Sequence, residues 1–256
     1  MQIAIGRSFI LPLPELPTEA IALVMVWLPP GTFLMGSPPD ELNRFEKEEQ
    51  QFEATINLGF WLGKYLITQA QWRSVMGYNP SHFQEISINC PVDSVTWYEA
   101  IEFCQSMNEL FADHLPTGYR FNLPTEVQWE YACRAGTKTI YNTGNALADL
   151  NRAAWHKGNS SDHPHPVGEK EPNGWGLYDM HGNTAEWCFD PTSAYPNAPV
   201  SDWVGVADGY VRSIRSSSWG TTPEDTGHRC ACRGAEIPDA KVPWFGFRVC
   251  LRQFLE

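Results

Sequence analysis

The chain has 256 residues, of which 43% are hydrophobic and 13% aromatic, and its formal net charge is −12. This composition is typical of a globular protein with one substantial core, and it excludes a disordered chain. The negative charge repels nucleic-acid phosphates and anionic lipid surfaces, so we expect no nucleic-acid partner.

The N-terminal region contains only short apolar runs. The run 21–28 has eight residues, far fewer than the roughly 20 that span a bilayer, so we predict no membrane span. We interpret it as a buried strand that ends at Pro29-Pro30-Gly31. Prolines interrupt the first 20 residues, which is not typical of a signal peptide. The seven cysteines are odd in number and scattered, and reduced thiols in a cytoplasmic protein are their simplest interpretation.

Three segments carry a helix capping box, in which a Thr hydroxyl and a Gln or Glu three residues later satisfy backbone N–H groups reciprocally. The boxes begin at Thr68, Thr96 and Thr125. We expect the first helix to end near Met76, because Gly77 is a good residue to follow a helix. The second helix is predicted to bury Ala100, Ile101, Phe103, Cys104 and Met107, and the third Val127, Tyr131 and Ala132.

Beyond Gly136 no helical period is sustained, and turn-forming residues alternate with short β-prone pieces. The best strand candidates are 211–218 and 247–251, which are rich in Val, Ile and Phe. The 20 glycines and 20 prolines are spread evenly, so no linker divides the chain. The sequence therefore predicts a single α+β domain with few short helices, short antiparallel strands and much irregular loop.

Six blocks follow one another along the chain. They are MVWLPPGTFLMGS (25–37), FWLGKYLITQAQWRSVMG (60–77), PVDSVTWYEAIEFC (91–104), FNLPTEVQWEYACRAGT (121–137), HPVGEKEPNGWGLYDMHGNTAEWCFD (165–190) and FGFRV (245–249). With these blocks the chain resembles the formylglycine-generating-enzyme (sulfatase-modifying-factor) family. The resemblance implies a C-type-lectin-like fold for one domain, 24–252, with an N-terminal extension, 1–23, packed on it.

The oxidases of that family bind copper through two cysteines that lie two and seven positions after the tryptophan of a Gly-Gly-Ser-Trp turn. Here the turn is SSSW (216–219), and the two positions are Thr221 and Thr226. Copper(I) prefers thiolates, and a hydroxyl does not replace one, so the resemblance predicts no copper and no enzyme activity. Cys230 and Cys232 form an alternative thiol pair, but they match the Arg-Cys-Ala-x-Arg-Gly of non-oxidase relatives, in which Cys230 is a small buried residue. A copper-dependent formylglycine-generating oxidase stays as the alternative hypothesis.

Another branch of this fold comprises the variable proteins of diversity-generating retroelements, in which templated mutagenesis rewrites the last segment of the gene and spares the framework codons. The framework of that branch is present here as Trp219, Pro223-Glu224, Arg229-Cys230-Ala231, Arg233-Gly234, Pro238-Asp239 and Gly246-Phe247-Arg248-Val249. The residues between share no period and no single chemistry, and we predict that they bind the ligand. They are Gly220, Thr221, Thr222, Asp225, Thr226, His228, Cys232, Ala235, Glu236, Ala240, Lys241, Val242, Pro243, Trp244 and Phe245.

This second resemblance predicts a non-catalytic, receptor-like protein. Its variable segment, about 212–245, would bind varied ligands, which we expect to be proteins; a degenerate scaffold of the family is the remaining alternative. A binding site can be rewritten only where its residues carry no packing load. We therefore expect one exposed face formed by Gly220, Thr221, Asp225, His228, Cys232, Lys241, Trp244 and Phe245, and burial of Trp219, Cys230 and Phe247. His228 and Asp225 resemble a general base and its orienting carboxylate, but they have no accompanying nucleophile.

The loop YDMHGNTAEW (178–187) is similar to a calcium-binding loop of the family. The resemblance implies a structural calcium held by Asp179, Gly182, Thr184 and Glu186. Oxygen ligands from carboxylates and backbone carbonyls suit this ion. In the alternative interpretation, Glu186 caps backbone N–H groups without any metal.

Overall fold

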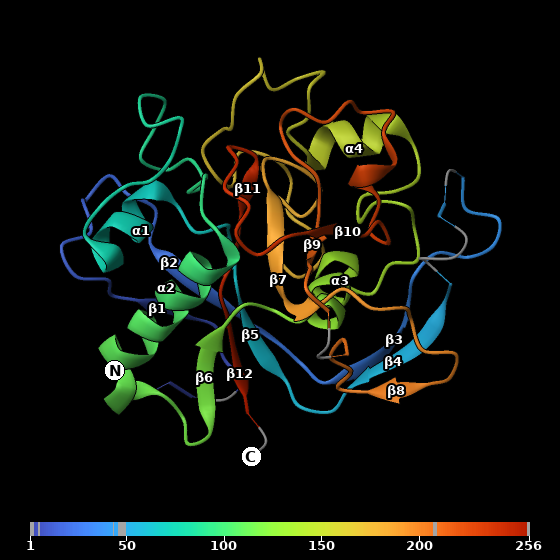
Figure 1. The fold of residues 1–256 in the computed structure, drawn as a ribbon, viewed down its shortest axis with the longest axis horizontal. Coiled ribbons are helices and arrows are strands. Elements are labelled where there is room, and N and C mark those ends of the chain that lie inside the picture. The colour runs from blue at the N-terminus through green and yellow to red at the C-terminus, as the bar shows by residue number, and fades with distance from the viewer. Residues whose placement is uncertain (1–2, 5, 43, 46–49, 207–208, 255–256) are drawn as a thin grey trace.

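The computed structural model describes residues 3–4, 6–42, 44–45, 50–206 and 209–254. Its largest sheet has five strands in the order β1 (Phe9–Leu11), β2 (Leu23–Leu28), β5 (Phe60–Gly63), β12 (Cys250–Gln253) and β6 (Tyr119–Asn122), and all neighbours are antiparallel. The strand predicted at 21–28 is β2, and half of its side chains are only partly buried. Strands from both ends of the chain meet in this sheet (Figure 1).

Two smaller sheets complete the β structure. One has the order β10 (Gly234–Glu236), β9 (Arg212–Arg215), β7 (Ala185–Pro191) and β11 (Phe245–Gly246); the other has the order β3 (Gly31–Met35), β4 (Phe52–Ile56) and β8 (Val200–Ser201). The pairs β11–β7 and β4–β8 are parallel, so the expectation of antiparallel strands holds for the other pairs only. The first of these sheets contains most of the regular structure of the C-terminal segment.

Three helices begin at the predicted capping boxes. They are α1 (Gln69–Met76), α2 (Trp97–Leu110) and α3 (Glu126–Arg134), and in each the Thr hydroxyl accepts a backbone N–H while the Gln or Glu side chain binds back. Helix α1 ends at Gly77, whose φ of 80° is left-handed and favours glycine. The predicted buried faces are confirmed except at Ile101, which is half-buried.

Some boundaries differ from the sequence prediction. A fourth helix, α4 (Leu147–Ala153), lies in the region predicted to lack helices. Its N-cap residue is Ala146, which has no hydroxyl to cap the helix. Its Asp149 carboxylate instead accepts the Ala146 N–H at 2.9 Å. The strand predicted at 211–218 is shorter, and the one predicted at 247–251 begins at Cys250. Two short 3₁₀ turns, η1 (Ala112–His114) and η2 (Thr226–His228), complete the structure.

The interior is rich in aromatic side chains. The largest fully buried ones include Trp61, Trp72, Trp129 and Trp187. Trp72 stacks on Phe103 of α2 with ring centroids 5.4 Å apart and so fastens α1 to α2. None of the helices among the described residues is long and apolar enough to cross a membrane.

A group of buried charges lies on one side of α3. Glu126 and Glu130, one helical turn apart, have no solvent exposure. Arg215 of β9 contacts both, with Nη1 3.2 Å from Glu126 Oε1 and Nη2 2.6 Å from Glu130 Oε2. Arg233 Nε binds Glu126 at 2.6 Å, and Arg134 Nε binds Glu130 at 2.8 Å. We call these five residues the α3 ion cluster.

The α3 ion cluster also binds backbone from distant segments. Glu130 Oε1 accepts the N–H of Gly36 at 2.8 Å, just after β3. Arg215 Nη2 donates to the carbonyl oxygen of Cys230 at 2.6 Å. Burial by itself raises the pKa of the Glu126 carboxyl, but Arg233 and Arg215 outweigh burial and hold that pKa below its ordinary value. The cluster therefore joins α3, β9, β3 and the C-terminal segment.

Replacing Arg215 by Met should destabilise the fold strongly. The substitution keeps an unbranched apolar stem but leaves two buried carboxylates without a shared cation, which costs about 3–5 kcal/mol of unfolding free energy. Urea unfolding of both proteins measures the difference. The matched control is Arg73→Met on α1, where the arginine is exposed and the expected change is within about 0.5 kcal/mol. Equal effects of the two substitutions would contradict the role given to the cluster.

Candidate functional site

Most of the predicted ligand-binding residues lie in the loops that connect β9, β10 and β11, whereas Ala235 and Glu236 lie on β10 and Phe245 on β11. The first loop is held at its start, because Trp219 N donates to Asn183 O at 3.0 Å and Ser160 Oγ donates to Trp219 O at 2.8 Å. Trp219 Nε1 donates to Pro243 O at 3.3 Å and so links this loop to the last one. The loops are irregular in backbone but fixed by hydrogen bonds to the scaffold.

Some of the predicted ligand-binding residues are exposed, as expected. Gly220, Thr222, Asp225, Lys241 and Trp244 are exposed. We call residues 219–249 the closing segment and these five residues the closing-segment surface. Trp244 is 43% exposed to solvent. The space beside the Gly220 Cα is open, with the nearest side-chain atom, Ser218 Oγ, 3.9 Å from a built Cβ. A larger residue therefore fits at this position without a clash.

The remaining predicted residues divide into several groups. Ala235 is exposed on β10, at the edge of its sheet. The partly buried ones are Thr221, Thr226, Glu236, Ala240, Val242 and Pro243. The expectation of exposure is wrong for His228, Cys232 and Phe245, all of which are buried. Among the framework residues, Cys230 and Phe247 are buried as predicted, whereas Trp219 is only half-buried.

Contacts far along the chain explain two of the corrections. Phe245 packs edge-on against Trp187 of the core, with ring centroids 5.1 Å apart. The His228 ring is enclosed, with Nδ1 2.7 Å from His181 O and Nε2 3.2 Å from Thr222 O, and it also hydrogen-bonds Ser217 Oγ. Burial lowers the pKa of His228. The exposed Asp225 carboxylate accepts the Gly227 N–H instead, so the proposed pair of base and orienting carboxylate is not formed.

Two exposed tyrosines outside the closing segment lie near its surface. Lys241 Nζ binds Glu99 Oε1 of α2 at 2.7 Å. Tyr98, the neighbour of Glu99, is 50% exposed, and Tyr78, after α1, is 44% exposed. Burial, followed by the charge of Glu99, raises the pKa of Tyr78. The sequence analysis missed both tyrosines, because only the fold brings α1 and α2 to the closing segment.

The two positions that hold thiols in the oxidases contain hydrogen-bonded hydroxyls. Thr221 Oγ1 lies 3.3 Å from Ser218 Oγ, and Thr226 Oγ1 lies 3.5 Å from Asp225 Oδ1. The two thiols of the alternative pair, Cys230 and Cys232, have different surroundings. Cys230 Sγ faces Cys133 Sγ at 3.7 Å in the core, whereas Cys232 Sγ contacts the carbonyl of Arg233.

The loop predicted to bind calcium offers one free carboxylate oxygen. Asp179 is buried, its Oδ2 accepts the Gly168 N–H at 2.9 Å, and its Oδ1 has no hydrogen-bond partner. Burial raises the pKa of this carboxyl to about 6. Glu186, in contrast, directs both oxygens at Arg248, at 2.7 and 3.0 Å. Asp179 thus fits a cation ligand, whereas Glu186 binds a guanidinium and caps no N–H group.

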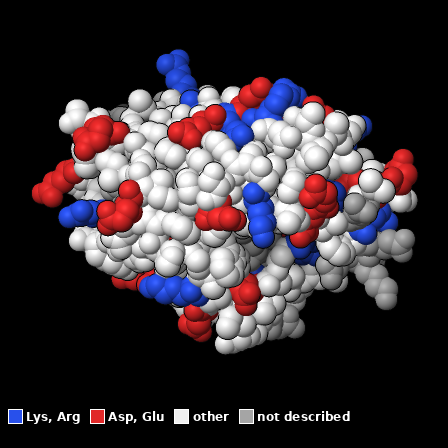
Figure 2. Space-filling view, turned by 90° about the horizontal axis from the view of Figure 1, so that it is seen from above, with Lys and Arg blue, Asp and Glu red and all other residues white. Residues whose placement is uncertain are grey.

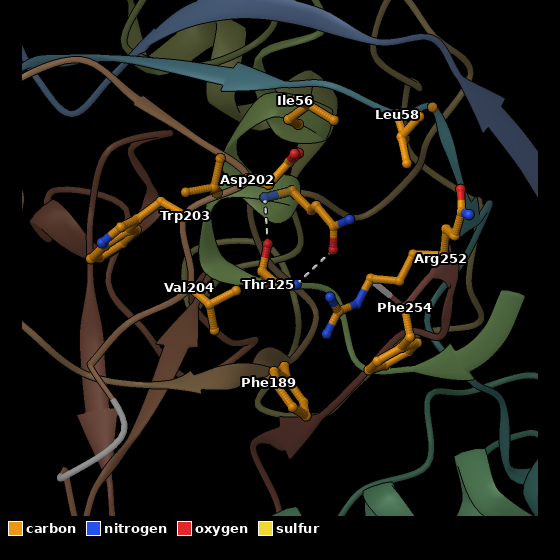
Figure 3. Close-up of a pocket in the computed structure, with 13 residues that line it drawn as sticks. Ile56, Leu58, Thr125, Phe189, Asp202, Trp203, Val204, Arg252 and Phe254 are labelled. Carbon is orange, nitrogen blue, oxygen red and sulfur yellow. Dashed lines mark hydrogen bonds between the residues drawn. The ribbon is translucent and has the colours of Figure 1, made fainter. Parts of the chain in front are cut away.

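A separate pocket of about 320 Å³ lies beside the first turn of α3, between the β4–β5 turn, β7 and β12. Figure 3 shows the Arg252 side chain directed into it, near Phe254 and Phe189. The guanidinium carbon is 4.5 Å from the centroid of the Phe254 ring and 5.0 Å from that of Phe189. Nothing in the sequence indicated this pocket, since five separate stretches line it, and none of its residues belongs to the predicted ligand-binding set.

The sequence pattern of the Sulfatase-modifying factor enzyme 1-like domain matches residues 14–253. The chain belongs to this family. The match confirms the family that the six sequence blocks predict, and the structure confirms the α+β fold.

Known members of the sulfatase-modifying-factor family differ in function. The chain is 31% identical over 205 residues to the chaperone protein LppX of Paenibacillus barcinonensis, which covers 62% of this chain and 71% of LppX. It is 28% identical over 216 residues to the formylglycine-generating enzyme of Mus musculus, covering 77% of this chain and 52% of the enzyme. The chain thus spans about half the length of that enzyme.

A solved structure extends the similarity to almost the entire chain. Treponema denticola variable protein 1 superimposes with a TM-score of 0.84 at 26% identity, covering 96% of this chain and 99% of that one. The family therefore includes a protein named as an enzyme, one named as a chaperone and one named as a variable protein.

Calcium at Asp179 stays a prediction, and removal of the ion tests it. An ion that binds only the folded state at 100 times its Kd stabilises that state by about 2.7 kcal/mol, so exhaustive chelation should lower the melting temperature by several degrees. Calcium, but not magnesium, should restore it. Asp179→Asn should abolish the response, whereas the exposed Asp239→Asn should retain it. A wild-type melting temperature unaffected by chelation and by added calcium would contradict the site.

Proposed function

We propose that this protein is a non-catalytic, ligand-binding member of its family. Its closing segment is diversified by a retroelement, so that different copies bind different protein ligands. The observation that carries the proposal is the division of this segment into exposed residues and residues fixed in the core. Trp244 is exposed while Phe245, the next residue, packs on Trp187.

This division allows the surface to change without loss of the fold. The framework residues Arg229, Cys230 and Phe247 are buried, and the neighbouring Arg233 binds Glu126 of the α3 ion cluster. Surface substitutions away from buried contacts usually change stability by no more than about 0.5 kcal/mol. The closing-segment surface therefore meets the physical requirement for repeated rewriting.

The chemistry of the surface supports a protein ligand. Trp244, Tyr78 and Tyr98 expose large aromatic rings, and aromatic residues contribute strongly to protein–protein binding. The face of the molecule seen in Figure 2 carries scattered charges of both signs, with broad uncharged areas between them. The exposed rings of Trp244, Tyr78 and Tyr98 are suited to a folded protein partner.

The thiol positions argue against the oxidase alternative. Thr221 and Thr226 supply hydroxyls, which are poor ligands for copper(I). Cys230 follows these two threonines in the sequence and lies beside Cys133 in space. It is fully buried. The similarity to the variable protein supports binding as the function. The chaperone protein LppX is a second similar protein whose name does not denote an oxidase.

Sequencing the DNA around the gene tests diversification directly. We expect a near-copy of the segment that encodes about residues 212–249, together with a reverse-transcriptase gene. Differences between the copies should fall at adenines of the template, and the codons changed should be those of the closing-segment surface. Codons for the buried Cys230 and Phe247 should be identical in both copies.

Two results would contradict this function. One is a gene neighbourhood with no near-copy, combined with identical closing segments in all isolates. The other is oxidation by the purified protein, with copper and oxygen, of the cysteine in a Cys-x-Pro-x-Arg peptide. The second result would favour the formylglycine-generating oxidase.

A further inference from the structure

Three metal-binding side chains from distant segments meet in the core. Cys133 lies near the end of α3, His181 in the loop before β7, and Cys230 in the closing segment. Their ligand atoms all lie within 4.8 Å of one another, and none of the three residues is exposed to solvent. Neither the proposed ligand-binding surface nor the predicted calcium loop uses any of these three side chains.

Two of the three distances between these atoms match those around a zinc ion. Zinc binds sulfur at about 2.3 Å and imidazole nitrogen at about 2.0–2.1 Å in tetrahedral geometry, which separates two sulfurs by about 3.8 Å and a sulfur from a nitrogen by about 3.6 Å. Here Cys133 Sγ is 3.7 Å from Cys230 Sγ and 3.8 Å from His181 Nε2. The third pair, Cys230 Sγ and the His181 nitrogen, lies within 4.8 Å, so an ion fits between the three atoms once this pair closes to about 3.6 Å.

The imidazole of His181 is oriented as a metal ligand requires. Its Nδ1 lies 2.8 Å from the carbonyl oxygen of His228, so Nδ1 carries the proton and donates it in a hydrogen bond. Nε2 then carries the lone pair, which accepts the Asn142 N–H at 3.0 Å, and a bound ion would take the place of this hydrogen bond. A carbonyl that fixes the tautomer through the other ring nitrogen is the common arrangement around ligating histidines.

The surroundings supply charge balance and a further oxygen. Two thiolates neutralise a divalent cation, and binding of the ion releases the two thiol protons. The amide oxygen of Asn142 is buried without a hydrogen-bond partner. It belongs to the residue whose N–H contacts Nε2, and it is the candidate for a fourth ligand.

We propose that Cys133, His181 and Cys230 bind a Zn²⁺ ion that cross-links the closing segment to α3. The zinc site does not depend on the proposed ligand-binding function, but the two are compatible. The ion would fix Cys230, a framework residue, while the neighbouring surface residues vary. A disulfide between the two cysteines is the competing outcome, and it would require the sulfurs to approach to about 2.05 Å.

Metal analysis of the purified protein tests the proposal. Expression with added zinc, followed by dialysis and elemental analysis, should give about one zinc per chain. The double variant Cys133→Ser/Cys230→Ser should fall to background. Cys104→Ser on α2 is the matched control, because Cys104 is equally buried and lies outside the cluster, and it should retain zinc.

Cobalt substitution gives a readout on the wild-type protein, so it remains valid even where a variant fails to fold. Co²⁺ in place of zinc should give the intense visible bands of tetrahedral coordination and a thiolate charge-transfer band. The proposal is overturned by absence of zinc and of these bands in the reduced protein, by copper in place of zinc, or by stoichiometric zinc in the double variant. A Cys133–Cys230 disulfide in peptides from protein purified with zinc would overturn it as well.

Discussion

The burial of two carboxylates on one face of α3 is the constraint on which most of this structure depends. Glu126 and Glu130 are inaccessible to water, and a buried charge is tolerated only when it is paired and hydrogen-bonded. Three arginines satisfy them, and these arginines come from α3 itself, from β9 and from the closing segment. Segments that have little regular structure of their own are thereby fixed in place by ionic contacts in a medium of low dielectric constant.

The same constraint explains how a loop-rich surface coexists with a single fold. Arg215 binds the carbonyl of Cys230, and the buried Arg248 of the FGFRV block pairs with Glu186 of β7. The loops between these fixed points need no secondary structure to hold their backbone in position. Function in this family can therefore differ by loop residues while the scaffold is retained, as the names of its members indicate.

Local features could be predicted from the sequence, whereas long-range contacts could not. The capping boxes at Thr68, Thr96 and Thr125 act within four residues, and all three start helices. Helix α4 was missed because its cap is a carboxylate without an N-cap hydroxyl. The burial of His228 depends on His181, 47 positions earlier, and the contact of Cys133 with Cys230 spans 97 positions. Spacing along a single sequence carries no record of such contacts.

Saturation mutagenesis of residues 219–249, with the abundance of folded protein as the readout, tests the central claim most directly. The account predicts that Gly220, Thr222, Asp225, Lys241 and Trp244 accept nearly every side chain. It also predicts that His228, Phe245 and Phe247 accept few, since loss of a buried aromatic ring costs about 3–5 kcal/mol. Uniform tolerance along the segment, or intolerance at Trp244 and Lys241, would contradict the separation of a variable surface from a fixed framework.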